Sequence, residues 1–200
     1  MREHCRNAAA QVMTQPLEAF VKSTLSQVSL MGIQLLWTQK ITEALEKSQK
    51  ENKGAMESKK KEIEKMLQEL TFLCLQDIPT RLERTKIETL VTVHVHQRDI
   101  TNEIKCQSPL DFDWQKQTRL YWRSEQDTCM VSITDWEQSY SYEFLGAKER
   151  LCITPLTDRC YITLAQAMSM FYGGSPAGPA GTGKTTLAKL LVKNLKLLFL

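Results

Sequence analysis

The chain has 200 residues, of which 42% are hydrophobic and 24% are charged, so it can form one large domain or two small ones around a hydrophobic core. Its 26 basic and 23 acidic residues leave a net charge of +3, which gives no strong attraction to nucleic acid or to an anionic membrane. No uninterrupted run of apolar residues is as long as a bilayer requires, so the sequence also excludes a membrane-spanning helix.

The cysteines and the first residues indicate a cytosolic chain. The sequence has six cysteines, far apart and without a C-x-x-C pair or the spacing of a zinc site: Cys5, Cys74, Cys106, Cys129, Cys152 and Cys160. Scattered thiols of this kind are typical of a reducing compartment. Residues 1–11 carry charge and have no apolar segment, so they do not resemble a signal peptide.

The first part of the chain predicts two long helices. Residues 1–15 show no periodicity, and we expect them to be disordered. In residues 16–75, apolar residues recur at three- and four-residue spacing, which is typical of helices. Gly54 interrupts the pattern, because glycine weakens a helix. We therefore expect two helices that form an antiparallel hairpin, with their turn at residues 52–54.

A charged segment, residues 46–65, surrounds this expected turn. Its glutamates are interspersed with lysines, which is typical of a helix surface in contact with water. A coiled coil or a basic docking face is the alternative interpretation.

Residues 79–95 predict a third helix, but residues 90–96 by themselves alternate like a strand. Periodicity alone leaves these two structures open. In a strand, His94 and His96 would face the same way and could both bind a metal. Because no third ligand lies nearby, we favour histidines that are hydrogen-bonded or lie on the surface.

After Pro109 the sequence becomes rich in aromatic and β-branched residues. Residues 129–134 and 140–144 predict two short strands, joined by a turn at residues 135–138. The aromatic residues are typical of the core of a small sheet. Base stacking on a nucleic acid, with the neighbouring arginines, is the alternative.

Gly146 and the charged residues after it predict a loop and a domain boundary near residue 147. Beyond this loop, Thr157 or Asp158 is expected to cap a helix that runs to about Phe171.

The most specific motif is a phosphate-binding loop. It matches the pattern G-x-x-x-x-G-K-[ST] without a gap: Gly178, Pro179, Ala180, Gly181, Thr182, Gly183, Lys184 and Thr185. Glycines allow a tight turn whose backbone amides point at a phosphate chain. Lys184 is expected to reach the β- and γ-phosphates of ATP, and the Thr185 hydroxyl to ligate Mg²⁺. Residues 186–195 predict a helix whose dipole adds to this site.

The groups that hydrolyse a nucleotide are not apparent. A nucleoside triphosphatase needs an acidic residue on a later strand to hold Mg²⁺ and polarise water, and usually an arginine finger. No acidic residue follows Thr185. We therefore assign no catalytic residue, and we expect the nucleotide cradle without measurable ATP hydrolysis by these 200 residues alone.

Several segments resemble the dynein heavy chain family. The most specific are residues 142–146, 153–161 and 173–185. Their order and spacing resemble the junction between the linker of that family and the first ATPase module of its ring. Earlier segments resemble the linker itself, so the resemblance extends over residues 17–195.

The resemblance implies a mixed α/β fold that is mainly helical. Behind a disordered N-terminus at residues 1–15, residues 16–147 would be a linker-like helical region with a small β element. Residues 148–200 would be the truncated start of a P-loop AAA+ α/β domain, the first module.

The family also implies a function: a minus-end-directed microtubule motor, driven by ATP with Mg²⁺. The sequence resembles the axonemal type most, and the cytoplasmic and intraflagellar-transport types are the alternatives. Pro155, Leu156 and Thr157 would lie against the adenine, and Thr185 would be the metal ligand. The implied partners are other dynein heavy, intermediate and light chains, and microtubules through parts absent from this chain, with no membrane and no nucleic acid. The implied location is the cytoplasm, the cytoskeleton and the axoneme of the cilium. One departure is Thr186, where the family usually has glutamate.

Two other functions remain open at this point. One is a non-catalytic linker scaffold whose phosphate loop is vestigial. The other is an unrelated ring ATPase that acts on nucleic acid, which the near-neutral charge and the absence of a clustered basic face disfavour.

Overall fold

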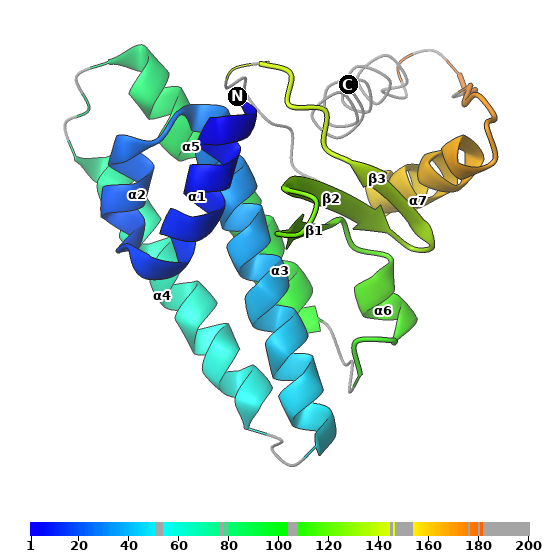
Figure 1. Cartoon of the computed structure of the whole chain (residues 1–200), viewed down its shortest axis with the longest axis horizontal. Coiled ribbons are helices and arrows are strands. Elements are labelled where there is room, and N and C mark those ends of the chain that lie inside the picture. The colour runs from blue at the N-terminus through cyan, green and yellow to red at the C-terminus, as the bar shows by residue number, and fades with distance from the viewer. Residues whose placement is uncertain are drawn as a thin grey trace.

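The computed structural model describes residues 1–50, 54–76, 78, 80–103, 108–144, 146, 154–175, 177–179 and 181, with the side chains of residues 49, 50, 155 and 156 excepted. In chain order, the described elements are α1 (Arg2–Thr14), α2 (Leu17–Ser23), α3 (Ser26–Lys50), α4 (Ala55–Leu75), α5 (Arg81–Glu103), α6 (Phe112–Gln115), β1 (Arg119–Arg123), β2 (Thr128–Ile133), β3 (Trp136–Ser139) and α7 (Pro155–Ser169). Figure 1 shows a bundle of helices beside a small sheet, with α7 next to the sheet. This arrangement confirms the predicted fold class, a mainly helical chain with a small β element.

The predicted helical hairpin is confirmed by α3 and α4, which lie side by side and run in opposite directions (Figure 1). Gly54 precedes the first residue of α4 as its N-cap. Helix α5 packs against both, and buried side chains such as Ile33, Leu70 and Leu90 fill the space between the helices. The exposed side of α4 carries the charged side chains of this helix. The interpretation of the charged segment as a helix surface in contact with water therefore fits residues 55–65.

Helix α5 resolves the ambiguity of residues 90–96, because the whole segment is helical. Residues two apart on a helix point about 200° apart, so His94 and His96 do not face the same way. His94 is 1% exposed, whereas His96 is partly exposed. Neither ring nitrogen of His94 has a hydrogen-bond partner, so the prediction of a hydrogen-bonded or surface histidine is wrong there.

Among the described residues, no group of His, Cys, Asp and Glu is arranged to hold a metal ion. Within the same ranges, each helix is either too short or too polar to cross a lipid bilayer.

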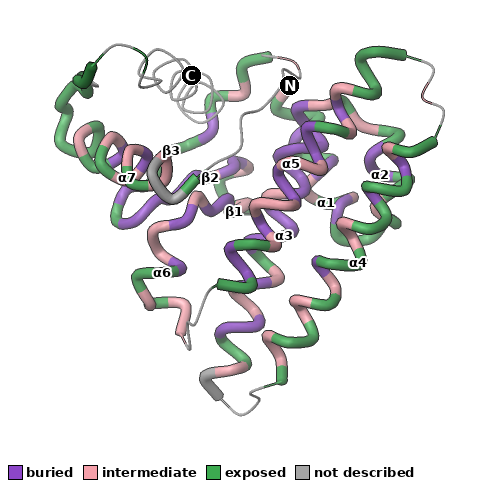
Figure 2. Tube along the Cα trace, turned by 180° about the vertical axis from the view of Figure 1, so that it is seen from behind, coloured by how far each residue is buried: buried purple, intermediate pink, exposed green. Residues whose placement is uncertain are grey.

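Helix α1 corrects the expectation that residues 1–15 are disordered. Its buried side chains are Cys5, Ala8 and Val12, which lie on one face because their spacing is three and four residues. Two of these three side chains are small and weakly apolar, so the stripe is faint in the sequence. The helix packs against α3, and Figure 2 shows a buried stripe in this part of the molecule.

Two arginines attach α1 to the turn between β1 and β2. Arg2 donates from Nε and Nη2 to the carbonyl oxygen of Asp127, at 3.1 and 2.9 Å. Arg6 donates from Nε to Oδ1 of Asp127 at 2.6 Å and forms an ion pair with the same carboxylate. The guanidinium of Arg2 also lies 5.6 Å from the ring centroid of Tyr142. These contacts hold α1 to a part of the chain that is remote in sequence.

Replacing Asp127 with alanine is expected to loosen α1. The substitution removes the acceptor of Arg6, and the half-exposed pair contributes about 1 kcal/mol. Because Asp127 has a φ of +49°, a conformation that alanine adopts less readily than aspartate, we expect a loss of at least that size in the free energy of unfolding and faster hydrogen exchange at the amides of α1. Asp135→Ala, in the exposed turn between β2 and β3, is the control. Equal effects of the two substitutions would contradict this account.

The sheet has three antiparallel strands in the order β1-β2-β3. The predicted strand at residues 129–134 is confirmed by β2, while β1 was not predicted. The prediction of a strand at residues 140–144 after a turn at 135–138 is wrong. The turn is only Thr134 and Asp135, with Thr134 at a φ of +51°, so β3 begins at Trp136.

A second hydrophobic cluster lies at the far end of α3. Trp114 of α6 packs against Trp37 of α3, with ring centroids 5.2 Å apart and an interplanar angle of 58°. Trp37 donates from Nε1 to Oγ1 of Thr101 on α5, at 3.2 Å. For Trp114, the interpretation of the aromatic residues as core residues is therefore confirmed.

Helix α7 begins earlier than predicted. Its N-cap is Thr154, not Thr157 or Asp158, and it ends at Ser169 rather than at Phe171. Pro155 at its first position suits this start, because proline has no N–H and its φ is already helical. Helix α7 buries the apolar side chains of Tyr161 and Ala165 and lies beside β3.

Candidate functional site

The phosphate loop is described at three of its eight predicted positions: Gly178, Pro179 and Gly181. Ala180, Thr182, Gly183, Lys184 and Thr185 lie outside the described residues. Gly181 has a φ of +80°, a conformation that strains any residue with a Cβ atom. A Cβ there would meet no atom within 4 Å, so backbone conformation rather than space requires glycine. The three described residues are exposed, as a surface for a ligand requires.

The segment predicted to lie against adenine is the first turn of α7 rather than a loop. Thr154 and Thr157 form a capping box, in which the Thr154 amide donates to Oγ1 of Thr157 at 2.8 Å. The Thr157 amide donates in return to Oγ1 of Thr154 at 3.4 Å. Pro155 and Leu156 lie between them in helical conformation, with side chains outside the description. The capping box holds the three predicted contact residues as one rigid turn.

The chain that leaves α7 stays close to that helix before it reaches the phosphate loop. The amide of Tyr172 donates to the carbonyl oxygen of Ala167 at 2.8 Å. Gly174 then lies against Leu164, so closely that a Cβ on residue 174 would be 1.9 Å from Cδ2 of Leu164. Glycine at this position therefore permits the close approach of the two segments.

A cleft of about 770 Å³ separates α7 from α5 and α6. Thr154 lines it, so the start of α7 borders the cleft. Asp158 lines it too, and burial raises the pKa of its carboxyl group, while the charges of His96 and Lys116 act in the opposite direction. Most of the other lining side chains are polar or charged: Asp99, Glu103, Asp113, Gln117, Arg159 and Thr163. His96 and Asp158 were singled out in the sequence only as a possible metal ligand and a possible helix cap, and the cleft itself was not predicted, because its residues come together only in the fold.

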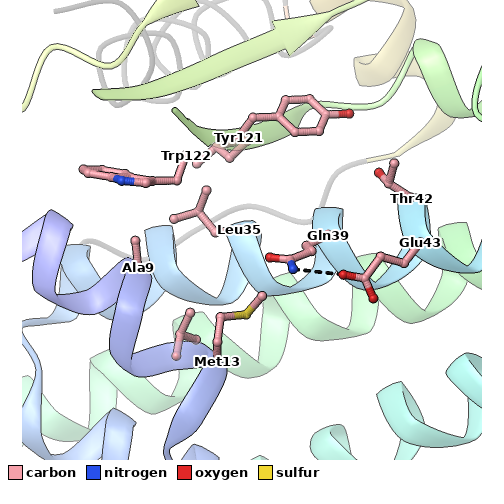
Figure 3. A pocket seen from close by; sticks show the side chains of 10 residues that line it. Ala9, Met13, Leu35, Gln39, Thr42, Glu43, Tyr121 and Trp122 are labelled. Atoms are coloured by element: carbon pink, nitrogen blue, oxygen red, sulfur yellow. Dashed lines mark hydrogen bonds between the residues drawn. The ribbon is translucent and has the colours of Figure 1, made fainter. Parts of the chain in front are cut away.

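A second hollow, of about 240 Å³, lies between α1, α3 and β1. Figure 3 shows side chains of α1 and α3 on one side of it, and Tyr121 and Trp122 of β1 on the other. Its lining is mainly apolar, with a polar end where Nε2 of Gln39 donates to Oε1 of Glu43 at 2.9 Å. None of the residues predicted for the nucleotide site lines this hollow.

Lys86 is a buried charged residue that the sequence analysis did not single out. Its Nζ atom donates to the carbonyl oxygens of Val21 and Thr24, at the end of α2. A cation is favourable there, because the carbonyl groups at a helix C-terminus carry partial negative charge. Burial lowers the pKa of Lys86. The contacts of Lys86 hold α2 against α5. The sequence offers little indication of this role, since Lys86 is simply a lysine four residues before Leu90, which the structure shows to be buried.

Comparison with known proteins places these features in one family. Residues 140–200 match a family model described as the hydrolytic ATP-binding site of the dynein motor region. The chain is 46% identical over 98% of its length to the dynein gamma chain of the flagellar outer arm from Chlamydomonas reinhardtii, of which it covers 4%. It is 47% identical to dynein axonemal heavy chain 5 from Rattus norvegicus, over 92% of its length and 5% of that relative.

A third relative is dynein axonemal heavy chain 8 from Homo sapiens, with 47% identity over 85% of this chain and 4% of the relative. The chain thus spans only about 4–5% of the length of these relatives. The matched region includes residues 178–185, the predicted phosphate loop. Because these alignments cover 85–98% of the chain at 46–47% identity, the chain belongs to the family of axonemal dynein heavy chains.

Proposed function

We propose that this chain joins the linker of an axonemal dynein heavy chain to its first ATPase module and holds ATP at that module. Residues 16–147 would be linker, and residues 148–200 the start of the module. Helix α1 would belong to the linker-like part, because it packs on α3 and binds Asp127. The observation that carries the proposal is the unbroken phosphate loop within the matched ATP-binding region.

In this proposal, the backbone amides of residues 178–185 surround the phosphates, and Lys184 neutralises their charge. The Thr185 hydroxyl would ligate Mg²⁺, and the ion would supply Lewis-acid polarisation of a phosphate oxygen. The left-handed conformation of Gly181 supports the loop, because a turn around phosphates needs such a position. The capped turn of Pro155, Leu156 and Thr157 provides a rigid surface for the adenine.

The wider role follows from the relatives. Their names place them in the axoneme and, for the gamma chain, in the flagellar outer arm. We infer that this chain serves in a ciliary or flagellar motor that moves along microtubules, in a complex with other dynein heavy, intermediate and light chains. The acidic groups that activate water are not assigned to any residue of this chain.

The test is ATP binding by the 200-residue chain, measured by calorimetry with and without Mg²⁺. Lys184→Ala is expected to weaken binding more than tenfold, because a charge-assisted contact with phosphate contributes about 1.5–3 kcal/mol. Thr185→Val is expected to remove most of the effect of Mg²⁺ on the affinity.

Lys189→Ala is the matched control, because Lys189 follows the phosphate loop and is not part of its pattern. Its affinity for ATP should equal that of the unmodified chain. If the unmodified chain binds no ATP, or if Lys184→Ala binds as tightly as the control, the vestigial-loop scaffold is the better function.

A further inference from the structure

Helix α7 faces α5 and α6 across a wide cleft rather than through packed side chains. Among the side chains of α7 that the structure describes, Tyr161 and Ala165 are the buried apolar ones, and the helix contacts β3. The side toward α5 and α6 opens into the cleft of about 770 Å³. Most of the side chains that line the cleft on this side are polar or charged.

Charged groups from all three helices line this cleft. Asp158 belongs to α7, His96 and Glu103 belong to α5, and Lys116 follows α6. Burial raises the pKa of the Asp158 carboxyl group, His96 and Lys116 act in the opposite direction, and Glu103 acts with burial. One carboxylate of α7 thus lines the same cleft as Lys116 and His96 on the facing wall.

Two other carboxylates of the cleft already have partners nearby in sequence. Asp99 accepts a hydrogen bond from Nη2 of Arg98 at 2.6 Å, and Asp113 accepts one from Nζ of Lys116 at 2.7 Å. Asp158 forms no ion pair within the described residues, and it is less exposed than Asp99 and Asp113. Lys116, directly after α6, thus pairs with Asp113 and also lines the cleft that Asp158 borders.

We propose that Asp158 is a positioning residue, which through Lys116 and His96 sets where the first turn of α7 lies relative to α5 and α6. The capping box makes residues 154–157 one rigid unit directly before Asp158, so a displacement of Asp158 displaces that turn. In this proposal, the interaction of Asp158 with Lys116 and His96 connects the linker-like helices to the module; we call this interaction the electrostatic joint. The consequence for adenine rests on the proposed function, because that turn is the proposed adenine contact.

The test of the joint needs no nucleotide. Hydrogen exchange of the α7 amides is measured in the 200-residue chain, at low salt, for Asp158→Asn, Lys116→Gln and the double variant. Each single substitution is expected to speed exchange about two- to fivefold, the range that corresponds to a partly exposed charge pair. The double variant should exchange no faster than the quicker single variant, because both remove the same interaction. In about 0.5 M salt, the variants should approach the unmodified chain, because screening weakens the interaction.

Two further variants separate the joint from effects within α7. Asp158 also lies in the first turns of its own helix, where a carboxylate is favourable without any partner. The charge-reversed pair, Asp158→Lys with Lys116→Asp, should therefore exchange more slowly than Asp158→Lys alone. Lys61→Met, on the exposed side of α4, should leave α7 unchanged. Additive effects of Asp158→Asn and Lys116→Gln, or no effect of Lys116→Gln, would overturn the proposal.

The link to the nucleotide is tested separately by the affinity for ATP. Asp158→Asn and Lys116→Gln are expected to weaken binding by similar factors of about two to five, again without adding up. Asp158→Glu should restore most of the affinity. If the unmodified chain binds no ATP, the proposed function is wrong. The hydrogen-exchange experiment still tests whether Asp158 and Lys116 interact. Coupled exchange with unaltered ATP affinity in both variants would overturn the claim that Asp158 positions the adenine contact.

Discussion

Replacing Trp114 with alanine is expected to lower the free energy of unfolding by about 3–5 kcal/mol. The side chain is 0% exposed and lies in one cluster with residues of α3, α4 and α5: Trp37, Ile41, Leu45, Ile63 and Ile100. Without it, the ring of Trp37 loses its aromatic partner at 5.2 Å and a cavity opens between these helices. Chemical denaturation of the 200-residue chain, followed by circular dichroism, measures the loss.

Trp114→Phe is the matched variant, because it keeps an aromatic ring in the same place. The indole nitrogen of Trp114 has no hydrogen-bond partner, so phenylalanine removes a buried polar group that gains nothing from its surroundings. We expect a cost of about 1.5 kcal/mol or less. If alanine costs no more than phenylalanine, Trp114 is not the centre of this cluster.

The second large effect is a loss of stability in mild acid that depends on His94. Burial lowers the pKa of His94 from 6.5 to about 4, and the positive charge of Lys40 acts in the same direction. Between these two pH values, the unfolded chain binds a proton at His94 and the folded chain does not. Stability from this group is therefore complete above about pH 6.5 and falls as the pH decreases toward 4, by about 3 kcal/mol in all.

Denaturation curves at several pH values measure this effect when the unmodified chain is compared with His94→Leu. Leucine breaks no hydrogen bond, because neither ring nitrogen of His94 has a partner. The variant should therefore fold, and its stability should fall less steeply between pH 6.5 and 4. His4→Ala, at an exposed position of α1, should keep the steep dependence. Parallel curves for His94→Leu and the unmodified chain would show that other groups cause the acid sensitivity.

The elements with strong periodicity could be predicted from the sequence. The apolar stripes of α3 and α4 are long and regular, and Gly54 marks the interruption between them. Helix α1 could not be predicted in this way, because its buried face consists of Cys5, Ala8 and Val12. Its strongest contacts are with Asp127, a partner that no local pattern identifies.

Other errors arose where short patterns fit two structures. Residues 90–96 alternate like a strand, yet they continue a helix whose buried face also includes Gln97 and Thr101. Thr154, Thr157 and Asp158 are all residues that cap helices, and only the hydrogen bonds select Thr154.

The candidate site also has a part that the sequence predicts and a part that it does not. The phosphate loop is continuous in sequence, so its pattern alone identified all eight positions. The cleft at α7 was not predicted, because His96, Lys116 and Asp158 are separated by many residues and meet only after folding. The roles of the loop residues remain a prediction for the binding experiment to decide.

The attachment of α1 to Asp127 has a consequence for the order of folding. The side chain of Arg6 and its partner are 121 positions apart along the chain. Closing so long a loop costs conformational entropy before the contact repays it, whereas α3 and α4 find each other across a short turn. During synthesis, α1 can pack against α3 first, and its attachment to Asp127 forms only after the β1–β2 turn has left the ribosome. The contacts of Arg2 and Arg6 are therefore among the last that α1 completes.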